Sequence, residues 1–175
     1  MKLKENVYSV GVMNPQLRVF DIIMRTEYGT TYNAYLVKGQ NKTALIETVH
    51  TSFFDEYLRN ITEVCDVKSI DYVIMNHTEP DHSGSLAKLL ALNPDIEIFG
   101  SMSAIRFLKA IANTEFKSHV VKDGEVLDLG GLSLKFLIAP FLHWPDSMFT
   151  YIEENGTLFT CDFLGCHYCE PQGLD

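Results

Sequence analysis

The sequence predicts an α/β fold, one unit in which mixed sheets are flanked by helices. Short segments rich in β-branched and aromatic residues open the chain, and helical segments then alternate with strands. A second set of strands closes it. The length of 175 residues suits one domain or most of one, and no repeat, low-complexity stretch or linker divides it.

The opening segments predict an antiparallel meander, because Gly29 and the turn-forming residues 39–41 separate short strand-like runs. An amphipathic helix should follow over residues 52–65, where Phe54, Tyr57 and Ile61 recur at helical spacing. The expected strands of the meander are residues 6–13, 17–23, 31–37 and 42–47.

The rest of the chain alternates strands and helices before it returns to strands. A helix over residues 85–92 should end at Asn93-Pro94, since the residue before a proline disfavours helical backbone. A second helix is expected over residues 102–112, with Ile105, Leu108 and Ile111 on one face. The expected strands are residues 72–75, 97–100, 125–129, 132–138, 148–152 and 158–161.

The densest chemical signal lies directly after the apolar segment 72–75, where four metal-binding side chains fall within six residues: His77, Glu79, Asp81 and His82. Imidazole and carboxylate groups are donors that iron, manganese and zinc accept. A solvated polar loop is the alternative, but such a loop has no structural need for this density of donors. The segment therefore predicts a metal site.

Two further residues join this cluster on chemical grounds. His143 follows the predicted strand 132–138, and Asp162 follows the predicted strand 158–161. Alone, His143 would be an ordinary loop histidine and Asp162 a strand-end cap. If the strands lie in neighbouring sheets, their ends converge on one edge, where such folds place their sites. We therefore expect both residues to be metal ligands.

Composition disfavours some partners and locations. A net charge of −9 works against binding to phosphate backbones, so nucleic acid is not expected as a partner. No apolar run approaches the length that spans a membrane, and the first residues lack the apolar core of a signal peptide. These observations predict a cytoplasmic protein with no membrane partner.

The four cysteines give a weaker signal. Cys166 and Cys169 form a C-x-x-C pair, and Cys161 lies nearby, whereas Cys65 stands apart. A zinc site usually needs two such pairs, and the sequence has no second pair. A redox pair and incidental thiols beside the main site both remain open, and we favour incidental thiols.

Together these motifs resemble the flavodiiron proteins, an iron-bearing branch of the metallo-β-lactamase superfamily. The resemblance implies a metallo-β-lactamase-like αββα sandwich. It rests on His77-x-Glu79-x-Asp81-His82, His143 in Leu-His-Trp-Pro-Asp-Ser, Asp162 in Thr-Cys-Asp-Phe-Leu-Gly, and Thr30-Thr-Tyr-Asn-Ala-Tyr-Leu36.

The resemblance also implies a ligand set for two iron ions. Position by position, His77, Glu79 and His143 would bind one iron, and Asp81 and His82 would bind the other. Asp162 would bridge the two metals. Family members differ in whether the histidine at the place of His82 binds metal.

Glu79 is the residue that best separates redox chemistry from hydrolysis. Zinc hydrolases of this superfamily carry a histidine there, in the pattern H-x-H-x-D-H. A carboxylate adds negative charge and a harder oxygen donor, which suits iron that cycles between its ferrous and ferric states. It also leaves less positive charge to activate a water. A zinc-dependent hydrolase of the same fold is the alternative.

The activity that the resemblance implies is reduction of dioxygen to water, of nitric oxide to nitrous oxide, or of both. Electrons would come from a flavin- or rubredoxin-type donor, and the family tends to form homodimers. Trp144, next to His143, is a candidate for an apolar wall that faces a flavin, with ordinary core packing as the alternative.

Two family features have no counterpart in residues 1–175. One is a further metal-binding histidine, because His167 follows Asp162 too closely to fill that place. The other is the flavodoxin-like domain that holds FMN, since no phosphate-binding loop follows a strand. The ending, residues 170–175, does not read as the natural end of a folded sandwich.

We therefore expect residues 1–175 to be the N-terminal portion of one diiron domain, truncated after its N-terminal half. A missing C-terminal half or a second subunit would supply the histidine and cover an exposed apolar face. A non-catalytic fragment that binds metal or oxygen is the second alternative.

Overall fold

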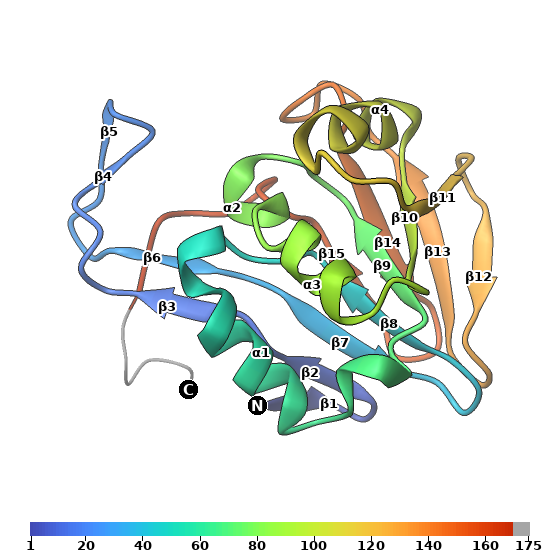
Figure 1. Ribbon diagram of the computed structural model, residues 1–175. Helices are drawn as coiled ribbons and strands as arrows, with labels where there is room; N and C mark the ends of the chain where they lie inside the picture. The colour runs from blue at the N-terminus through green and yellow to red at the C-terminus, as the bar shows by residue number, and fades with distance from the viewer. Residues whose placement is uncertain (170–175) are drawn as a thin grey trace.

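A seven-stranded sheet forms the centre of the molecule in a computed structural model that describes residues 1–169 (Figure 1). The chain ending at residues 170–175 lies outside the described residues. The strand order is β1-β2-β7-β8-β9-β10-β11. Neighbours from β1 to β8 are antiparallel, and those from β8 to β11 are parallel. The bounds are β1 (Lys2–Lys4), β2 (Val7–Ser9), β7 (Tyr35–Lys38), β8 (Thr43–Ile46), β9 (Tyr72–Met75), β10 (Glu97–Gly100) and β11 (Lys117–Val120).

Side chains of the central strands alternate between two cores. Leu45 and Val73 belong to the apolar cluster on the side of the helices, whereas Ile46 and Ile74 belong to the cluster on the other face. All four are fully buried. Because successive strand residues point to opposite faces, near-continuous apolar strands are what a sheet covered on both sides requires. Burial of each such side chain contributes about 1.5–3 kcal/mol.

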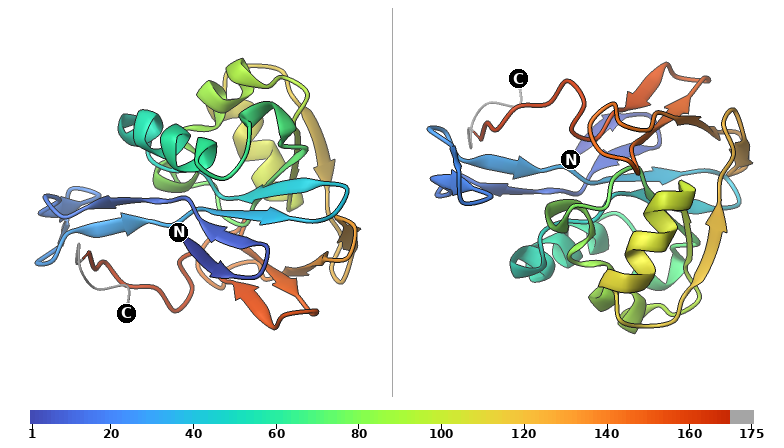
Figure 2. Two further views of the ribbon diagram at one scale, coloured as in Figure 1. Left: turned by 90° about the horizontal axis from the view of Figure 1, so that it is seen from below. Right: turned by 90° about the horizontal axis from the view of Figure 1, so that it is seen from above.

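Helices cover one face of this sheet, as Figure 2 shows. Tyr57 and Ile61 of α1 and Leu108 of α4 are buried in the cluster between helices and sheet. None of the helices in residues 1–169 is long and apolar enough to span a membrane. The helical segments are η1 (Thr51–Phe53), α1 (Phe54–Thr62), η2 (Val67–Ser69), α2 (Pro80–Ser83), α3 (Leu86–Leu92) and α4 (Met102–Ile111).

A four-stranded antiparallel sheet covers the other face (Figure 2). Its Phe136 and Met148 are buried between the sheets, while Val126 and Leu158 are 54% and 47% exposed. No helix of residues 1–169 covers the outer face of this sheet. For residues 1–169, the expected αββα sandwich is confirmed in three of its layers, α, β and β. The strands are β12 (Val126–Asp128), β13 (Ser133–Ile138), β14 (Met148–Ile152) and β15 (Thr157–Phe159).

The opening segments form no simple meander, and this prediction is wrong in its connectivity. The N–H groups of Val10 and Gly11 both donate to the carbonyl of Ala34, which is the geometry of a bulge that ends one pairing and starts another. The predicted strand 6–13 therefore divides into β2 and a separate β3. Two small ribbons result, β3 (Val12–Asn14) with β6 (Thr30–Tyr32) and β4 (Val19–Phe20) with β5 (Met24–Arg25).

Other elements also depart from the sequence prediction. The metal-binding segment includes one helical turn, α2, which the sequence analysis did not predict. β11 was not predicted because its residues, Lys-Ser-His-Val, lack an apolar pattern, and it pairs at the edge of the sheet. The predicted strands 72–75, 97–100 and 148–152 have the observed bounds.

Candidate metal site

The predicted site residues come together at one edge of the two sheets. Asn76, directly after β9, joins the sheets: its carbonyl accepts from the Met148 N–H at 3.0 Å and its side-chain oxygen accepts from the Thr150 hydroxyl at 2.7 Å. A cavity of about 520 Å³ opens at this edge. Its lining includes His82, His143 and Asp162, so the segments after three different strands, β9, β13 and β15, face one space.

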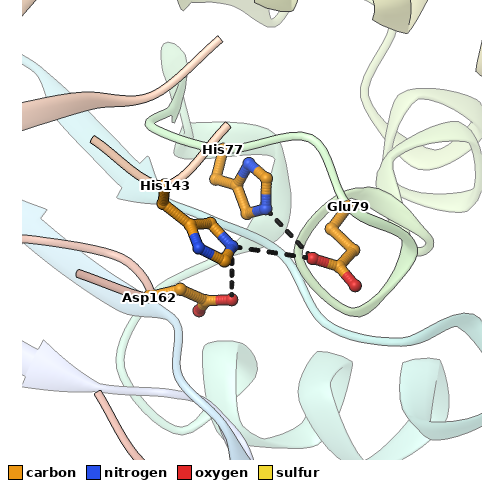
Figure 3. A group of neighbouring side chains, drawn as sticks. All are labelled: His77, Glu79, His143 and Asp162. Carbon is orange, nitrogen blue, oxygen red and sulfur yellow. Dashed lines mark hydrogen bonds and ion pairs between the residues drawn. The ribbon is translucent and has the colours of Figure 1, made fainter. Parts of the chain in front are cut away.

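The first donor group contains His77, Glu79, His143 and Asp162, each with one ligand atom within 4.8 Å of the others. Figure 3 shows these side chains pointing toward one another. Glu79 Oε2 lies 3.2 Å from His77 Nε2 and 3.9 Å from His143 Nε2. Asp162 Oδ2 lies 3.4 Å from His143 Nε2. Two imidazoles and two carboxylates at this spacing could surround a single metal ion.

The second donor group contains Asp81, His82 and Asp162. His82 Nε2 lies 2.8 Å from Asp162 Oδ1 and 3.6 Å from Asp81 Oδ2. Pro80 begins α2, and the turn places Asp81 and His82 beside the first group. Asp162 is common to both groups and uses a different oxygen toward each. A carboxylate shared in this way is suited to bridge two cations.

Carboxylates of the site favour the protonated form of two of its histidines. Burial lowers the pKa of His77, but its hydrogen bonds with Asp146 and Glu79 outweigh burial and raise the pKa to about 9. Burial likewise lowers the pKa of His82, yet carboxylates that include Asp162 raise it well above its ordinary value. Since a bound cation stabilises the same carboxylates, metal binding would displace these protons.

Sequence reasoning missed Asp146, which holds His77 from behind. Asp146 is fully buried, and its Oδ2 lies 3.2 Å from His77 Nδ1. The same oxygen accepts from the Thr78 N–H at 2.8 Å and from the Thr78 hydroxyl at 2.7 Å. Metal-binding histidines usually donate their second N–H to a carboxylate in this way. The available signal was an acidic residue three positions after His143, within the same motif.

Glu47 is the second functional residue that sequence reasoning missed. It follows β8 and is 2% exposed, and its Oε2 lies 3.4 Å from His82 Nδ1. The signal in the sequence was a charged residue directly after the apolar run Ala44-Leu-Ile46. A buried carboxylate is costly unless it is paired, so such a residue is a candidate partner for a site group.

Trp144 and the cysteines lie near the site in different ways. The Trp144 ring centroid is 5.1 Å from that of His77, and the residue is 42% exposed, so Trp144 contacts a candidate ligand and lies outside the buried core. Cys161 and Cys166 line the cavity, but neither joins a donor group. His167 Nδ1 lies 3.0 Å from the Thr30 hydroxyl oxygen. All four cysteines are free thiols.

Several buried polar atoms at the site make no hydrogen bond of good geometry, which fits a site that binds a cation. Asp81 Oδ1 and His82 Nε2 belong to residues of the second donor group, and His82 Nε2 has only its ion-pair contacts with Asp162 and Asp81. Glu47 Oε2 and His82 Nδ1 face each other at 3.4 Å. Unpartnered buried polar atoms are costly and are usually explained by an ion or a water. The donors are nitrogen and oxygen atoms without a thiolate, a set that suits iron, manganese or zinc.

Comparisons with known proteins identify the family of the chain. The family model described as ODP family beta lactamase matches residues 30–172. The chain is 61% identical over 177 residues to the flavo-diiron protein FprA2 of Clostridium acetobutylicum, an alignment that covers 100% of the chain and 44% of that protein. It is 37% identical over 167 residues to the type A flavoprotein fprA of Rhodobacter capsulatus, covering 94% of the chain and 38% of that protein.

Solved structures give the same result. The rubredoxin oxygen:oxidoreductase of Desulfovibrio gigas superposes with a TM-score of 0.93 at 34% identity, covering 98% of this chain and 43% of that one. The resemblance to flavodiiron proteins is therefore confirmed. The chain spans less than half the length of each of these three proteins.

Proposed function

Because the chain belongs to the ODP family of β-lactamase-like domains, we propose that it carries the metal site of a diiron oxidoreductase. The complete protein would reduce dioxygen to water, nitric oxide to nitrous oxide, or both. The single observation that carries this proposal is the position of Asp162, whose two oxygens face two separate donor groups. Similarity to proteins named as flavodiiron proteins and as an oxygen oxidoreductase supports it.

In the proposed ligand set, His77, Glu79 and His143 hold one iron, Asp81 and His82 hold the other, and Asp162 bridges them. When bound, two iron ions would supply the redox chemistry by binding a small diatomic molecule and donating electrons to it.

The residues around the ligands would position them and restrict water. Asp146 orients His77 through Nδ1, which leaves Nε2 directed toward Glu79. Trp144 covers this face of the histidines with an apolar ring. We propose that the same ring faces the flavin of a donor.

Glu79 favours this function over a zinc hydrolase. It stands within the first donor group, 3.2 Å from His77 Nε2, where the hydrolases of the superfamily place a third nitrogen donor. A second carboxylate in this group reduces the net positive charge of a bound metal, which favours ferric over ferrous iron and weakens activation of water.

The second donor group is the less complete one, with three residues among those described against four in the first. We propose that a histidine from the remainder of the protein, or from a second subunit, completes it. Residues 1–175 would then be the N-terminal portion of one diiron domain. We also propose that the protein accepts electrons from a flavin- or rubredoxin-type donor and pairs with a second copy in a homodimer. The protein would be located in the cytoplasm.

Metal content after anaerobic purification from iron-supplemented cells tests the proposal. Iron should be retained, and Glu79→Ala and Asp162→Ala should each abolish loading of a paired centre. Cys166→Ser is the control, because this exposed thiol belongs to neither donor group. If either carboxylate variant kept two metals per chain, the ligand assignment would be wrong.

Activity separates a working reductase from a module that only binds metal. The complete protein, supplied with an external flavin- or rubredoxin-type donor, should consume oxygen or nitric oxide, and Glu79→Ala should not. Turnover of thioester, phosphodiester or β-lactam substrates by a zinc-loaded protein would support the hydrolase instead.

A further inference from the structure

We propose that Glu47 and Thr48 are positioning residues that fix His82 as a metal ligand through Nε2. This inference rests on the proposed metal site and adds residues outside the predicted ligand set. Glu47 and Thr48 follow β8, whereas His82 belongs to α2, so two distant segments meet at this point.

Glu47 holds the ring of His82 from its far side. Its Oε1 accepts from the Asn76 N–H at 2.7 Å, which leaves Oε2 directed at His82 Nδ1, 3.4 Å away. The carbonyl of Glu47 accepts from the Tyr57 hydroxyl at 3.2 Å. Glu47 is 2% exposed, so its carboxylate is shielded from solvent and pairs with the Asn76 N–H and the His82 ring.

Thr48 holds the main chain of His82. Its N–H and its hydroxyl both donate to the carbonyl of His82, at 2.9 and 2.5 Å. The His82 N–H in turn donates to the Glu79 carbonyl at 2.9 Å. Backbone and ring of His82 are therefore both held by groups that are themselves buried, and the ring has one direction available for Nε2.

In that direction lie the other residues of the second donor group. Nε2 lies 2.8 Å from Asp162 Oδ1 and 3.6 Å from Asp81 Oδ2. A metal-bound histidine carries its proton on the other ring nitrogen and donates it to a carboxylate or carbonyl, which selects the tautomer and the ring orientation. Glu47 Oε2 is the carboxylate placed to accept it. No other group hydrogen-bonds this oxygen, so it is free to accept from His82.

The backbone of Glu47 also indicates a constrained position. Its φ of +63° lies in the left-handed region, which residues other than glycine, asparagine and aspartate rarely adopt. Strained conformations persist where the surrounding structure holds them, and they cluster at functional sites. The constraint turns the chain after β8 so that Glu47 and Thr48 contact the same residue of α2.

Binding of Co(II) alone to the metal-free protein tests this inference without any measurement of turnover. Glu47→Gln and Thr48→Val should each weaken binding at the second position by about 10–100-fold, the usual effect of losing an orienting partner. Thr48→Ser, which keeps the hydroxyl, should restore affinity. Glu125→Gln is a matched control, because Glu125 also faces a histidine, His119, at 2.6 Å but lies outside both donor groups.

Proton NMR of the Co(II)-loaded protein gives a signature that a purely structural role would not move. A proton on a metal-bound imidazole is shifted by the unpaired electrons and disappears in heavy water. His82→Asn should remove one such resonance, and Glu47→Gln should move the same resonance or broaden it through faster exchange. Thermal unfolding identifies any variant that fails to fold. For variants that fold, the difference in Co(II) affinity between Thr48→Ser and Thr48→Val then shows whether the hydroxyl is required.

The outcomes separate this inference from the function on which it rests. If Co(II) binds and neither His82→Asn nor Glu47→Gln changes affinity or spectrum, His82 is not a ligand and the inference is overturned, while the proposed metal site stands. If Co(II) does not bind, or if it binds and Glu79→Ala leaves its affinity unchanged, the proposed metal site itself is wrong. Loss of the resonance with His82→Asn, together with weaker binding in Glu47→Gln, supports the inference.

Discussion

Replacing Asp146 with asparagine should lower both the stability of the metal-free protein and its affinity for metal. A single oxygen of Asp146 serves His77 Nδ1 at 3.2 Å, the Thr78 N–H at 2.8 Å and the Thr78 hydroxyl at 2.7 Å. Both Asp146 and His77 are fully buried. The amide oxygen of asparagine can keep all three contacts, so the change removes chiefly the negative charge beside His77.

The expected magnitude follows from these contacts. Removing one partner of a buried charged pair costs about 3–5 kcal/mol. Because the bonds to Thr78 remain, we expect the lower end, about 3 kcal/mol of the free energy of unfolding. Metal affinity should fall by roughly 10–100-fold, because the partner that orients the His77 ring loses its charge and becomes a weaker acceptor.

Urea unfolding of the metal-free protein and competition with a chelator for Co(II) measure the two effects. Asp95→Asn is the control: it removes the same charge from an exposed residue that contacts Lys117 at 2.7 Å, where solvent screens the pair. The urea concentration at the midpoint of unfolding should be the same for Asp95→Asn as for the unchanged protein. Equal midpoints and equal Co(II) affinities for the two variants would refute the role given to Asp146.

Three further predictions concern metal choice, thiol reactivity and pH. Glu79→His, which recreates the zinc-hydrolase pattern, should raise the ratio of zinc to iron in protein purified from medium containing both, and an unchanged ratio would contradict the importance of this carboxylate. Iodoacetamide at pH 8 should modify the exposed Cys166 but spare Cys161, whose pKa is raised to about 12 by burial, as peptide mass spectrometry can check. Burial lowers the pKa of His77, yet Asp146 and Glu79 raise it to about 9, so the metal-free protein holds at pH 7 a proton that metal binding must displace. Metal affinity should therefore rise from pH 7 to pH 9, and calorimetry that finds equal affinity and no proton release at pH 7 would be inconsistent with this charge balance.

Regular elements were predictable where the local pattern was strong. β9, β10 and β14 have the predicted bounds because each is an apolar run of strand length followed by polar or turn residues. The opening meander was not predictable, because the bulge at Val10 and Gly11 depends on the carbonyl of Ala34, far along the chain. β11 depends on pairing with β10, and its own residues carry no apolar signal.

The types of donor atom at the candidate site were determined by the sequence alone. His77, Glu79, Asp81 and His82 follow one apolar strand, and residue type and spacing sufficed to predict nitrogen and oxygen donors for a metal. The family resemblance had already implied that these donors divide into two groups with Asp162 shared, and the structure groups them in this way. Only the tertiary structure decided which carboxylates lie behind the histidines, Asp146 behind His77 and Glu47 behind His82. His77 and Asp146 are 69 positions apart in the chain. Such contacts arise from the packing of one sheet on another, which no local pattern encodes.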